Sequence, residues 1–270
     1  MTRRNWAPLL ALTLASALAI AAIKADGSAK ARPQNEDELK KRMADLQAQV
    51  YSLSARLADW PQLGYFRDRN REFKKSASPR PLIVFIGDSI TAHWNLVPSG
   101  FFPGENYVNR GLDAQISGQM LLRLRQDVLG LSPDAVVILG GVNELSWGPR
   151  EERLEIIEGN IQSMAELAQF NHVAVIICSL TPAARNEGGP EKKPRITALN
   201  RWLRQYSKDN HLVYLDYFSR MTLPDGSTRE ELFADGTHPN DAGYRVMASE
   251  ARAAISQLGL KPRTGTVKLP

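Results

Sequence analysis

The chain has 270 residues, of which 43% are hydrophobic and 23% charged, and this composition excludes disordered, collagenous and multispanning proteins. Its single cysteine, Cys178, excludes an intrachain disulfide framework and a multi-cysteine zinc site, so packing must stabilise the fold. The formal net charge of +5 does not indicate a nucleic-acid-binding protein, because outside residues 1–25 the chain has 31 basic against 29 acidic residues, a net charge of only +2.

The first 25 residues have the pattern of an export signal. Arg3 and Arg4 precede an apolar run of 18 residues, from Trp6 to Ile23, and small residues up to Ala25 offer cleavage sites. The run is also long enough to span a bilayer, so the segment is interpreted either as a cleaved signal peptide or as an uncleaved membrane anchor. In both cases the sequence predicts that the protein is exported, to the periplasm or out of the cell.

Residues 26–74 are interpreted as a linker followed by an amphipathic helix. After a capping box at Asn35 and Glu38, apolar side chains recur every three or four residues, and Pro61 ends the pattern. A helix with this heptad spacing could associate with a second copy in a homo-oligomer, pack on the protein's own domain, or act as a spacer. The apolar positions are Leu39, Met43, Leu46, Val50, Leu53 and Leu57.

A catalytic domain is expected from residue 75 to residue 260, followed by a tail over 261–270. Short, continuous apolar runs alternate with helix-spaced leucines, which is the rhythm of a parallel sheet with crossover helices. Strands that are apolar throughout are buried on both faces, so the sequence predicts an α/β domain of three αβα layers. The expected strands are 82–86, 107–108, 135–139, 173–177 and 212–215, and the expected helices are 119–128, 151–170, 196–208 and 241–258.

Four polar motifs follow the expected strands, where the chemistry of a parallel sheet is located. They are Gly-Asp-Ser-Ile-Thr at 87–91, Asn-Arg-Gly at 109–111, Gly-Gly-Val-Asn-Glu at 140–144 and Asp-Gly-Thr-His-Pro-Asn at 235–240. Each has an ordinary explanation by itself: a serine caps a helix, a glycine allows a positive φ, an asparagine turns the chain, and a histidine lies on the surface. Their coincidence at the strand ends of one sheet predicts a single active site.

These four motifs, in this order, resemble those of the SGNH hydrolases, also called GDSL esterases and lipases, over about residues 75–258. The sequence is also similar to bacterial GDSL-type acylhydrolases of the platelet-activating-factor acetylhydrolase type. The resemblance implies a flavodoxin-like fold with five parallel strands in the order 2-1-3-4-5. Two positions depart from the usual pattern: Glu144 stands where the third motif usually ends in Asp, and Ile90 stands where the family name has Leu. Neither replaces a catalytic group.

A serine is a poor nucleophile unless a base, itself oriented by a third group, takes its proton. Ser89, His238 and Asp235 fit these three roles, and the spacing of three between Asp235 and His238 places both at one turn before a helix. Asp88 is the alternative acid, but strand alternation points it away from the nucleophile. No histidine or cysteine cluster requires a metal, and no cofactor motif is present in the sequence.

Attack on an ester carbonyl forms an oxyanion that needs hydrogen-bond donors. The backbone N–H groups of Ser89 and Gly111 and the side-chain amide of Asn143 supply three, and by resemblance they form the family's oxyanion hole. His93, Trp94 and Trp147 lie near the motifs and are expected either to line an acyl or alcohol pocket or to pack in the core.

The sequence therefore predicts a secreted serine esterase that hydrolyses a carboxylic ester through an acyl-enzyme. Short acyl chains are expected, because no long apolar loop interrupts the motifs between Gly111 and Asn143. The substrate is a small-molecule, glycan or lipid ester, and sugar O-acetyl esters, lysophospholipids and thioesters all remain open. The rival interpretation is a noncatalytic cell-envelope binding module on the same fold.

Overall fold

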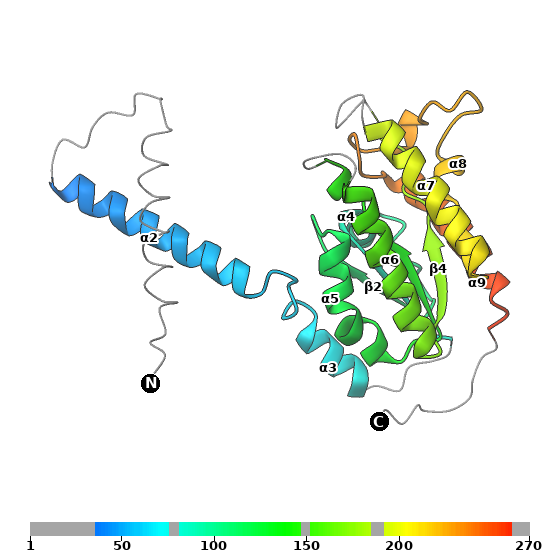
Figure 1. Cartoon of the computed structure of the whole chain (residues 1–270), viewed down its shortest axis with the longest axis horizontal. Coiled ribbons are helices and arrows are strands. Elements are labelled where there is room, and N and C mark those ends of the chain that lie inside the picture. Colours follow the sequence, from blue (N-terminus) through cyan, green and yellow to red (C-terminus); the bar gives the residue numbers. More distant parts are fainter. Residues whose placement is uncertain (1–35, 76–80, 147–151, 185–191, 261–270) are drawn as a thin grey trace, which may run out of the picture. The chain divides into compact units, whose positions relative to one another are not determined.

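The structure is a computed structural model that describes residues 36–75, 81–146, 152–184 and 192–260 (Figure 1). The chain divides into two units, residues 1–58 and residues 59–270. The predicted export segment, Asn35 and the tail over 261–270 lie outside the described residues. Within the described part, no helix combines the length and the apolarity needed to cross a membrane.

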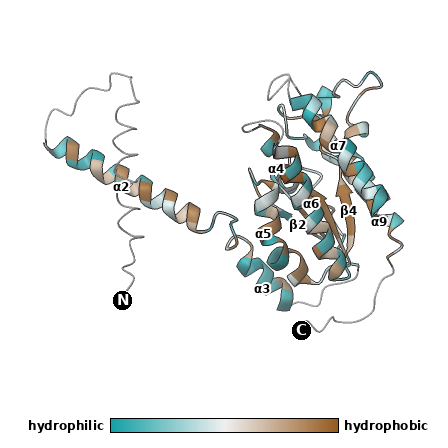
Figure 2. Ribbon diagram, viewed as in Figure 1, coloured by the Kyte–Doolittle hydropathy of each residue, from teal (hydrophilic) through white to brown (hydrophobic). Residues whose placement is uncertain are grey.

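The larger unit is built on five parallel strands in the order β2-β1-β3-β4-β5. The strands are β1 (Ile83–Gly87), β2 (Tyr107–Gly111), β3 (Ala135–Leu139), β4 (Ala174–Cys178) and β5 (Val213–Leu215). Every residue of β1 and β3 is buried, as expected for central strands rich in valine and isoleucine, and β4 is brown along its length in Figure 2. The predicted fold class and strand order are confirmed.

Helices cover both faces of this sheet and complete a three-layer αβα domain. Three long helices, α5 (Ser117–Asp127), α6 (Glu152–Phe170) and α7 (Lys192–Asp209), follow one another across one face (Figure 1). On the other face α9 (Asp241–Gln257) packs against β5. The short helices are α4 (Ser89–Ala92) and α8 (Tyr217–Arg220), and single 3-10 turns span His93–Leu96, Leu129–Leu131, Glu144–Ser146 and Glu230–Leu232.

The second strand is longer than predicted. Asn109, Arg110 and Gly111 were expected to follow it, but they lie within β2 and pair with Phe85, Ile86 and Gly87 of β1. A buried arginine at a strand end is unexpected from sequence. Tertiary contacts explain it, because the Arg110 guanidinium bonds to Asn70 Oδ1 at 2.8 Å and lies 4.7 Å from the Phe66 ring centroid.

The larger unit begins at Asp59 and so includes residues ahead of the domain predicted over 75–260. Residues 67–75 form a helix, α3 (Arg67–Lys75), which the sequence did not predict because it is polar almost throughout. It is anchored by Asn70, whose amide donates to Asp127 Oδ1 of α5 at 2.7 Å. The segment that precedes α3 is held by three glutamine side chains, which donate to its backbone carbonyls. The bonds run from Gln115 to Pro61, from Gln119 to Trp60 and from Gln126 to Leu63.

The described part of the smaller unit is the predicted amphipathic helix, α2 (Glu36–Ala58). It ends at Ala58, three residues before Pro61. Its ribbon alternates between teal and brown in Figure 2, and its apolar side chains are 46% to 73% exposed: Leu39, Met43, Leu46, Val50, Leu53 and Leu57.

Candidate active site

Three side chains form a continuous hydrogen-bonded chain at the carboxyl end of the sheet. Ser89 begins α4 directly after β1, and His238 and Asp235 lie in the loop that precedes α9. The Nε2 atom of His238 is 2.9 Å from Ser89 Oγ, and its Nδ1 atom is 2.8 Å from Asp235 Oδ2. The structure therefore brings together Ser89 and His238, which are 149 positions apart, with one imidazole nitrogen facing the hydroxyl and the other facing a carboxylate.

The loop that carries Asp235 is folded around its carboxylate. Asp235 Oδ1 accepts the backbone N–H groups of Thr237 and His238, both at 2.7 Å. Partial burial opposes ionisation, but these two bonds and the His238 ring hold the Asp235 pKa at about 2. The carboxylate is therefore charged throughout the neutral range, as a group that must orient an imidazole and stabilise its cation needs to be.

The Asn143 side chain is fixed by a hydrogen bond to the loop between β2 and α5. Its Nδ2 atom donates to the carbonyl of Gln115 at 2.9 Å, which uses one of its two N–H groups. Asn143 stands at the turn after β3, where Gly141 has a φ of +114° that a residue with a side chain rarely adopts. The predicted donor is thus held in one orientation, with its second N–H not needed for that bond.

The predicted donor at Gly111 is engaged within the protein. Its backbone N–H donates to Asn109 Oδ1 at 2.8 Å, and the Asn109 amide donates in turn to the Thr91 carbonyl at 2.6 Å. Gly111 is required here by a close approach and not by a positive φ, since an added Cβ would lie 2.2 Å from the backbone nitrogen of Ala92. The Ser89 N–H differs, because the first N–H groups of a helix have no intrahelical acceptor.

Comparison with known proteins agrees with this geometry. Residues 85–246 match the GDSL-like lipase/acylhydrolase family. The chain belongs to that family. This GDSL hydrolase is an ester-hydrolysing enzyme, and its match spans all four motifs that carried the resemblance. No curated protein matched the sequence.

Solved structures similar to this GDSL hydrolase include two from Bacteroides. A proposed acylhydrolase from Bacteroides fragilis has 34% identity and a TM-score of 0.67, and the alignment covers 74% of this chain and 98% of the other. A GDSL-like lipase from Bacteroides thetaiotaomicron has 32% identity and a TM-score of 0.66, with 73% and 98% covered. An acetylxylan esterase from Geobacillus stearothermophilus, at 18% identity and a TM-score of 0.52, shares the fold, with 65% and 94% covered.

Three aromatic residues near the motifs were expected either to line a pocket or to pack in the core. Of the two that the structure describes, His93 and Trp94, only His93 contacts one of the three hydrogen-bonded residues Ser89, His238 and Asp235. Its ring centroid is 4.7 Å from that of His238, and its Nε2 atom is 3.1 Å from Asp113 Oδ1. Trp94 is buried among Phe101, Phe102 and Tyr244, so it packs in the core and does not line a pocket. Trp147 lies outside the described residues.

Two residues at this site had no signal in the sequence reasoning. Gln115 and Arg123 are both fully buried. The Gln115 carbonyl accepts the Asn143 amide, and the Arg123 Nε atom donates to Gln115 Oε1 at 2.5 Å. Neither belongs to one of the four motifs. The only signal in the sequence is that Arg123 lies within the helix-spaced apolar pattern of α5. An arginine that is fully buried there needs a polar partner nearby.

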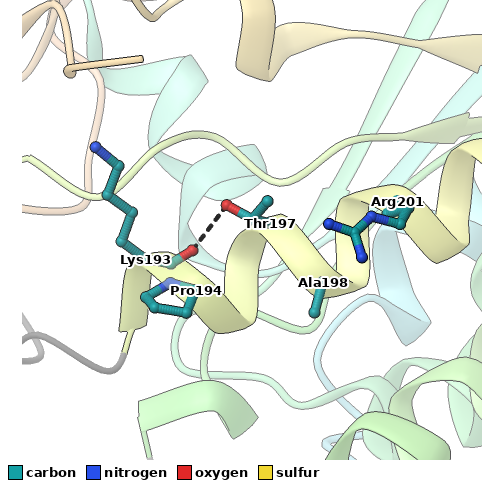
Figure 3. Close-up of a pocket in the computed structure, with 5 residues that line it drawn as sticks. All are labelled: Lys193, Pro194, Thr197, Ala198 and Arg201. Carbon is teal, nitrogen blue, oxygen red and sulfur yellow. Dashed lines mark hydrogen bonds between the residues drawn. The ribbon is translucent and has the colours of Figure 1, made fainter. Parts of the chain in front are cut away.

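The hollow drawn in Figure 3 is separate from the triad. It has a volume of about 600 Å³ and lies along α7, with none of the three triad residues in its lining. Thr197 Oγ1 donates to the Lys193 carbonyl at 3.0 Å, so that hydroxyl is used within the helix. The hollow is lined by Lys193, Pro194, Thr197, Ala198 and Arg201, and it contains no residue of the four motifs.

Asp88 is a buried helix cap, and the carboxylate that contacts the His238 ring is that of Asp235. Its Oδ1 atom accepts the Ile90 N–H at 2.9 Å at the start of α4, whereas Oδ2 is buried and has no hydrogen-bond partner among the described residues. Burial, opposed by the Ile90 bond and reinforced by Glu144, raises its pKa from 3.8 to about 7. Deprotonation of Asp88 at higher pH therefore lowers the free energy of unfolding.

We expect Asp88→Asn to remove a pH-dependent loss of stability. With a folded-state pKa above the unfolded one, the folded state binds the extra proton between about pH 4 and 7, so stability falls as pH rises through this window. From pH 5 to pH 7 this group costs roughly 2 to 3 kcal/mol of unfolding free energy. Urea unfolding of both proteins at several pH values measures it: the advantage of Asp88→Asn should grow with pH, and parallel curves would contradict the assignment.

Proposed function

We propose that this enzyme is a serine esterase in which Ser89 is the nucleophile, His238 its general base and Asp235 the orienting acid. The unbroken chain from Ser89 Oγ through the imidazole to Asp235 carries the proposal. His238 Nε2 takes the hydroxyl proton as Oγ attacks the ester carbonyl carbon, and it then gives that proton to the departing alkoxide, leaving an acyl-enzyme. Water attacks the acyl-enzyme in the same way and releases the acid.

Two donors are ready for the oxyanion of each tetrahedral intermediate: the Ser89 N–H and the second N–H of the Asn143 amide. Both lie at strand ends that converge on the same edge of the sheet. The Gly111 N–H becomes a third donor only if the Asn109 side chain turns away from it. Because the donors are held before charge develops, they stabilise the transition state more than the ground state.

The preferred substrate is an ester of a short acyl chain. The sequence between Gly111 and Asn143 contains no lid-like apolar loop, and the structure fills that interval with α5 and β3. The acetylxylan esterase of the same fold gives a precedent for a two-carbon acyl group. Rates for p-nitrophenyl esters from acetyl to palmitoyl test this, and rates that climb steadily with chain length would favour a lipase or lysophospholipase.

The same panel separates the other readings of this site. Faster turnover of acyl-thioesters than of matched oxygen esters would indicate a thioesterase. A noncatalytic binding module would hydrolyse none of these esters. Covalent labelling of Ser89 by a fluorophosphonate, absent in Ser89→Ala, is the result expected of the serine esterase.

We further propose that residues 1–25 export the protein and are then cleaved, or remain as a membrane anchor. The support is the flank of Arg3 and Arg4 beside the apolar run to Ile23. Fractionation of the native host with N-terminal sequencing tests both alternatives. Full-length protein free in the cytoplasm would refute export.

We also propose that α2 associates with α2 of a second copy in a parallel coiled coil. Leu39, Leu46 and Leu53 occupy d positions, with the β-branched Val50 at an a position, a combination suited to two strands. Sedimentation of the full chain should show a dimer that Leu46→Lys weakens. Ala48→Lys, which adds the same charge on the outer side of the heptad, is the control and should leave the dimer intact.

A further inference from the structure

The side chain of Asn143 must be held by the protein if it is to meet an oxyanion at a fixed place. A backbone donor is fixed by the chain itself, but an asparagine amide turns about two bonds. Here one amide N–H is bonded to the Gln115 carbonyl, and Gln115 is 28 positions earlier in the chain. The orientation of Asn143 thus depends on where Gln115 is held.

Gln115 is held from two sides, and its side chain is fully buried. Its Oε1 atom accepts Arg123 Nε at 2.5 Å, and its Nε2 atom donates to the Pro61 carbonyl at 3.0 Å. Ala114, directly before it, has a φ of +57°, which is unfavourable for a residue with a Cβ. Such a conformation persists only where the surroundings impose it, and the clamped side chain of Gln115 provides that restraint.

Arg123 connects this clamp to the strand that carries the nucleophile. Its Nη2 atom donates to the carbonyl of Gly87, the last residue of β1 and two positions before Ser89. The same guanidinium therefore contacts both the support of Asn143 and the support of Ser89. Asp127, 3.5 Å from Nη1, supplies the opposite charge that a fully buried arginine requires.

The geometry points to Gln115 and Arg123 as positioning residues that hold the Asn143 amide in register with Ser89 during ester hydrolysis. This inference rests on the proposed function, because it assigns to Asn143 the role of an oxyanion donor. It goes beyond that function by placing two residues outside the four motifs in control of transition-state stabilisation. If the two residues had a purely structural role, their substitution would lower the stability of the fold but would not lower kcat specifically.

The test is a double-mutant cycle between Gln115→Met and Asn143→Ala in the full chain. Methionine keeps the length of the side chain and removes both of its hydrogen bonds. We expect Gln115→Met to lower kcat by about tenfold with KM changed less than about threefold, and to lower kcat less than about twofold further when Asn143 is already alanine. Binding of a boronic acid that forms a tetrahedral adduct on Ser89 should weaken in parallel with kcat/KM.

Gln126→Met is the matched control. Gln126 lies on α5, and like Gln115 it donates to a carbonyl of the segment before α3, that of Leu63. It has no bond to Arg123 or Asn143 among the hydrogen bonds of the described residues. Its kcat and KM should stay within about twofold of the parent values. An equal loss of kcat in Gln126→Met and Gln115→Met would show that kcat depends on the attachment of the segment before α3. That result would overturn the positioning role of Gln115.

If Gln115→Met does not fold, Gln115→Glu takes its place in the cycle. Glutamate keeps the contact with Arg123 but sets a carboxylate against the Pro61 carbonyl, so a kcat loss of about threefold that disappears in Asn143→Ala is expected. A loss of equal size in both backgrounds, or an unchanged kcat, overturns the inference. Failure of the proposed function is distinguishable, because Ser89→Ala would then hydrolyse esters as the parent does.

Discussion

Ser89→Ala and His238→Ala should each lower kcat by more than about 10⁴-fold, and the double variant should be hardly slower than either one. The two residues act as one unit, because the 2.9 Å contact between Nε2 and Oγ lets the hydroxyl lose its proton only to that ring. Asp235 orients the imidazole and does not react, so Asp235→Ala should keep more activity than either. Steady-state rates on p-nitrophenyl acetate measure all four proteins.

The control for this series is Ser163→Ala, because Ser163 is a half-buried serine on α6 whose hydroxyl donates to the Gly159 carbonyl of its own helix. It should match the parent in rate and in thermal unfolding. The serine-esterase mechanism is wrong if Ser89→Ala, with unchanged unfolding, hydrolyses every ester that the parent hydrolyses.

Asn143→Ala should lower kcat by about 10² to 10³, which corresponds to roughly 2.7 to 4 kcal/mol, with little change in KM. The amide meets charge that exists only in the transition state, so its loss affects the chemical step and not the binding of the ester. Steady-state kinetics over a range of substrate concentrations separates the two constants.

Asn171→Ala is the companion control, because the Asn171 amide bonds to the carbonyl of Leu167 on the surface at the end of α6. Both of its kinetic constants should be those of the parent. A raised KM with an unchanged kcat in Asn143→Ala would identify Asn143 as a substrate-binding residue, and the oxyanion assignment would fail.

The site depends on the fold in a simple way. The carboxyl ends of β1, β2 and β3 are in register, with Gly87 paired to Gly111 on one side and to Leu139 on the other. One motif lies at the carboxyl end of each of these three strands, so the parallel pairing of the strands alone brings three motifs together. The fourth motif is added by α9, whose residue Tyr244 donates its hydroxyl to the Ile90 carbonyl at 2.8 Å.

The sequence by itself determined the strands, their order through the family resemblance, and the three triad candidates. Continuous valine and isoleucine runs such as 135–139 specify buried strands wherever they occur, because apolar side chains on both faces must leave water. Asp235 and His238 are three residues apart in one tight turn, so their contact is local and readable from spacing. Ser89 followed from its place after the first such run.

Only the tertiary structure decided which of the candidate donors are engaged within the protein and what holds them. The engagement of Gly111 by Asn109, the helix α3 and the clamp of Gln115 by Arg123 and Pro61 carry no periodic pattern. One bond of the clamp joins Gln115 to Pro61, 54 positions earlier in the chain, and the packing of α5 against β1 brings Arg123 to the Gly87 carbonyl. Sequence spacing predicts local turns and apolar faces, whereas the partner of a buried polar group is set by whichever distant group the fold brings within reach.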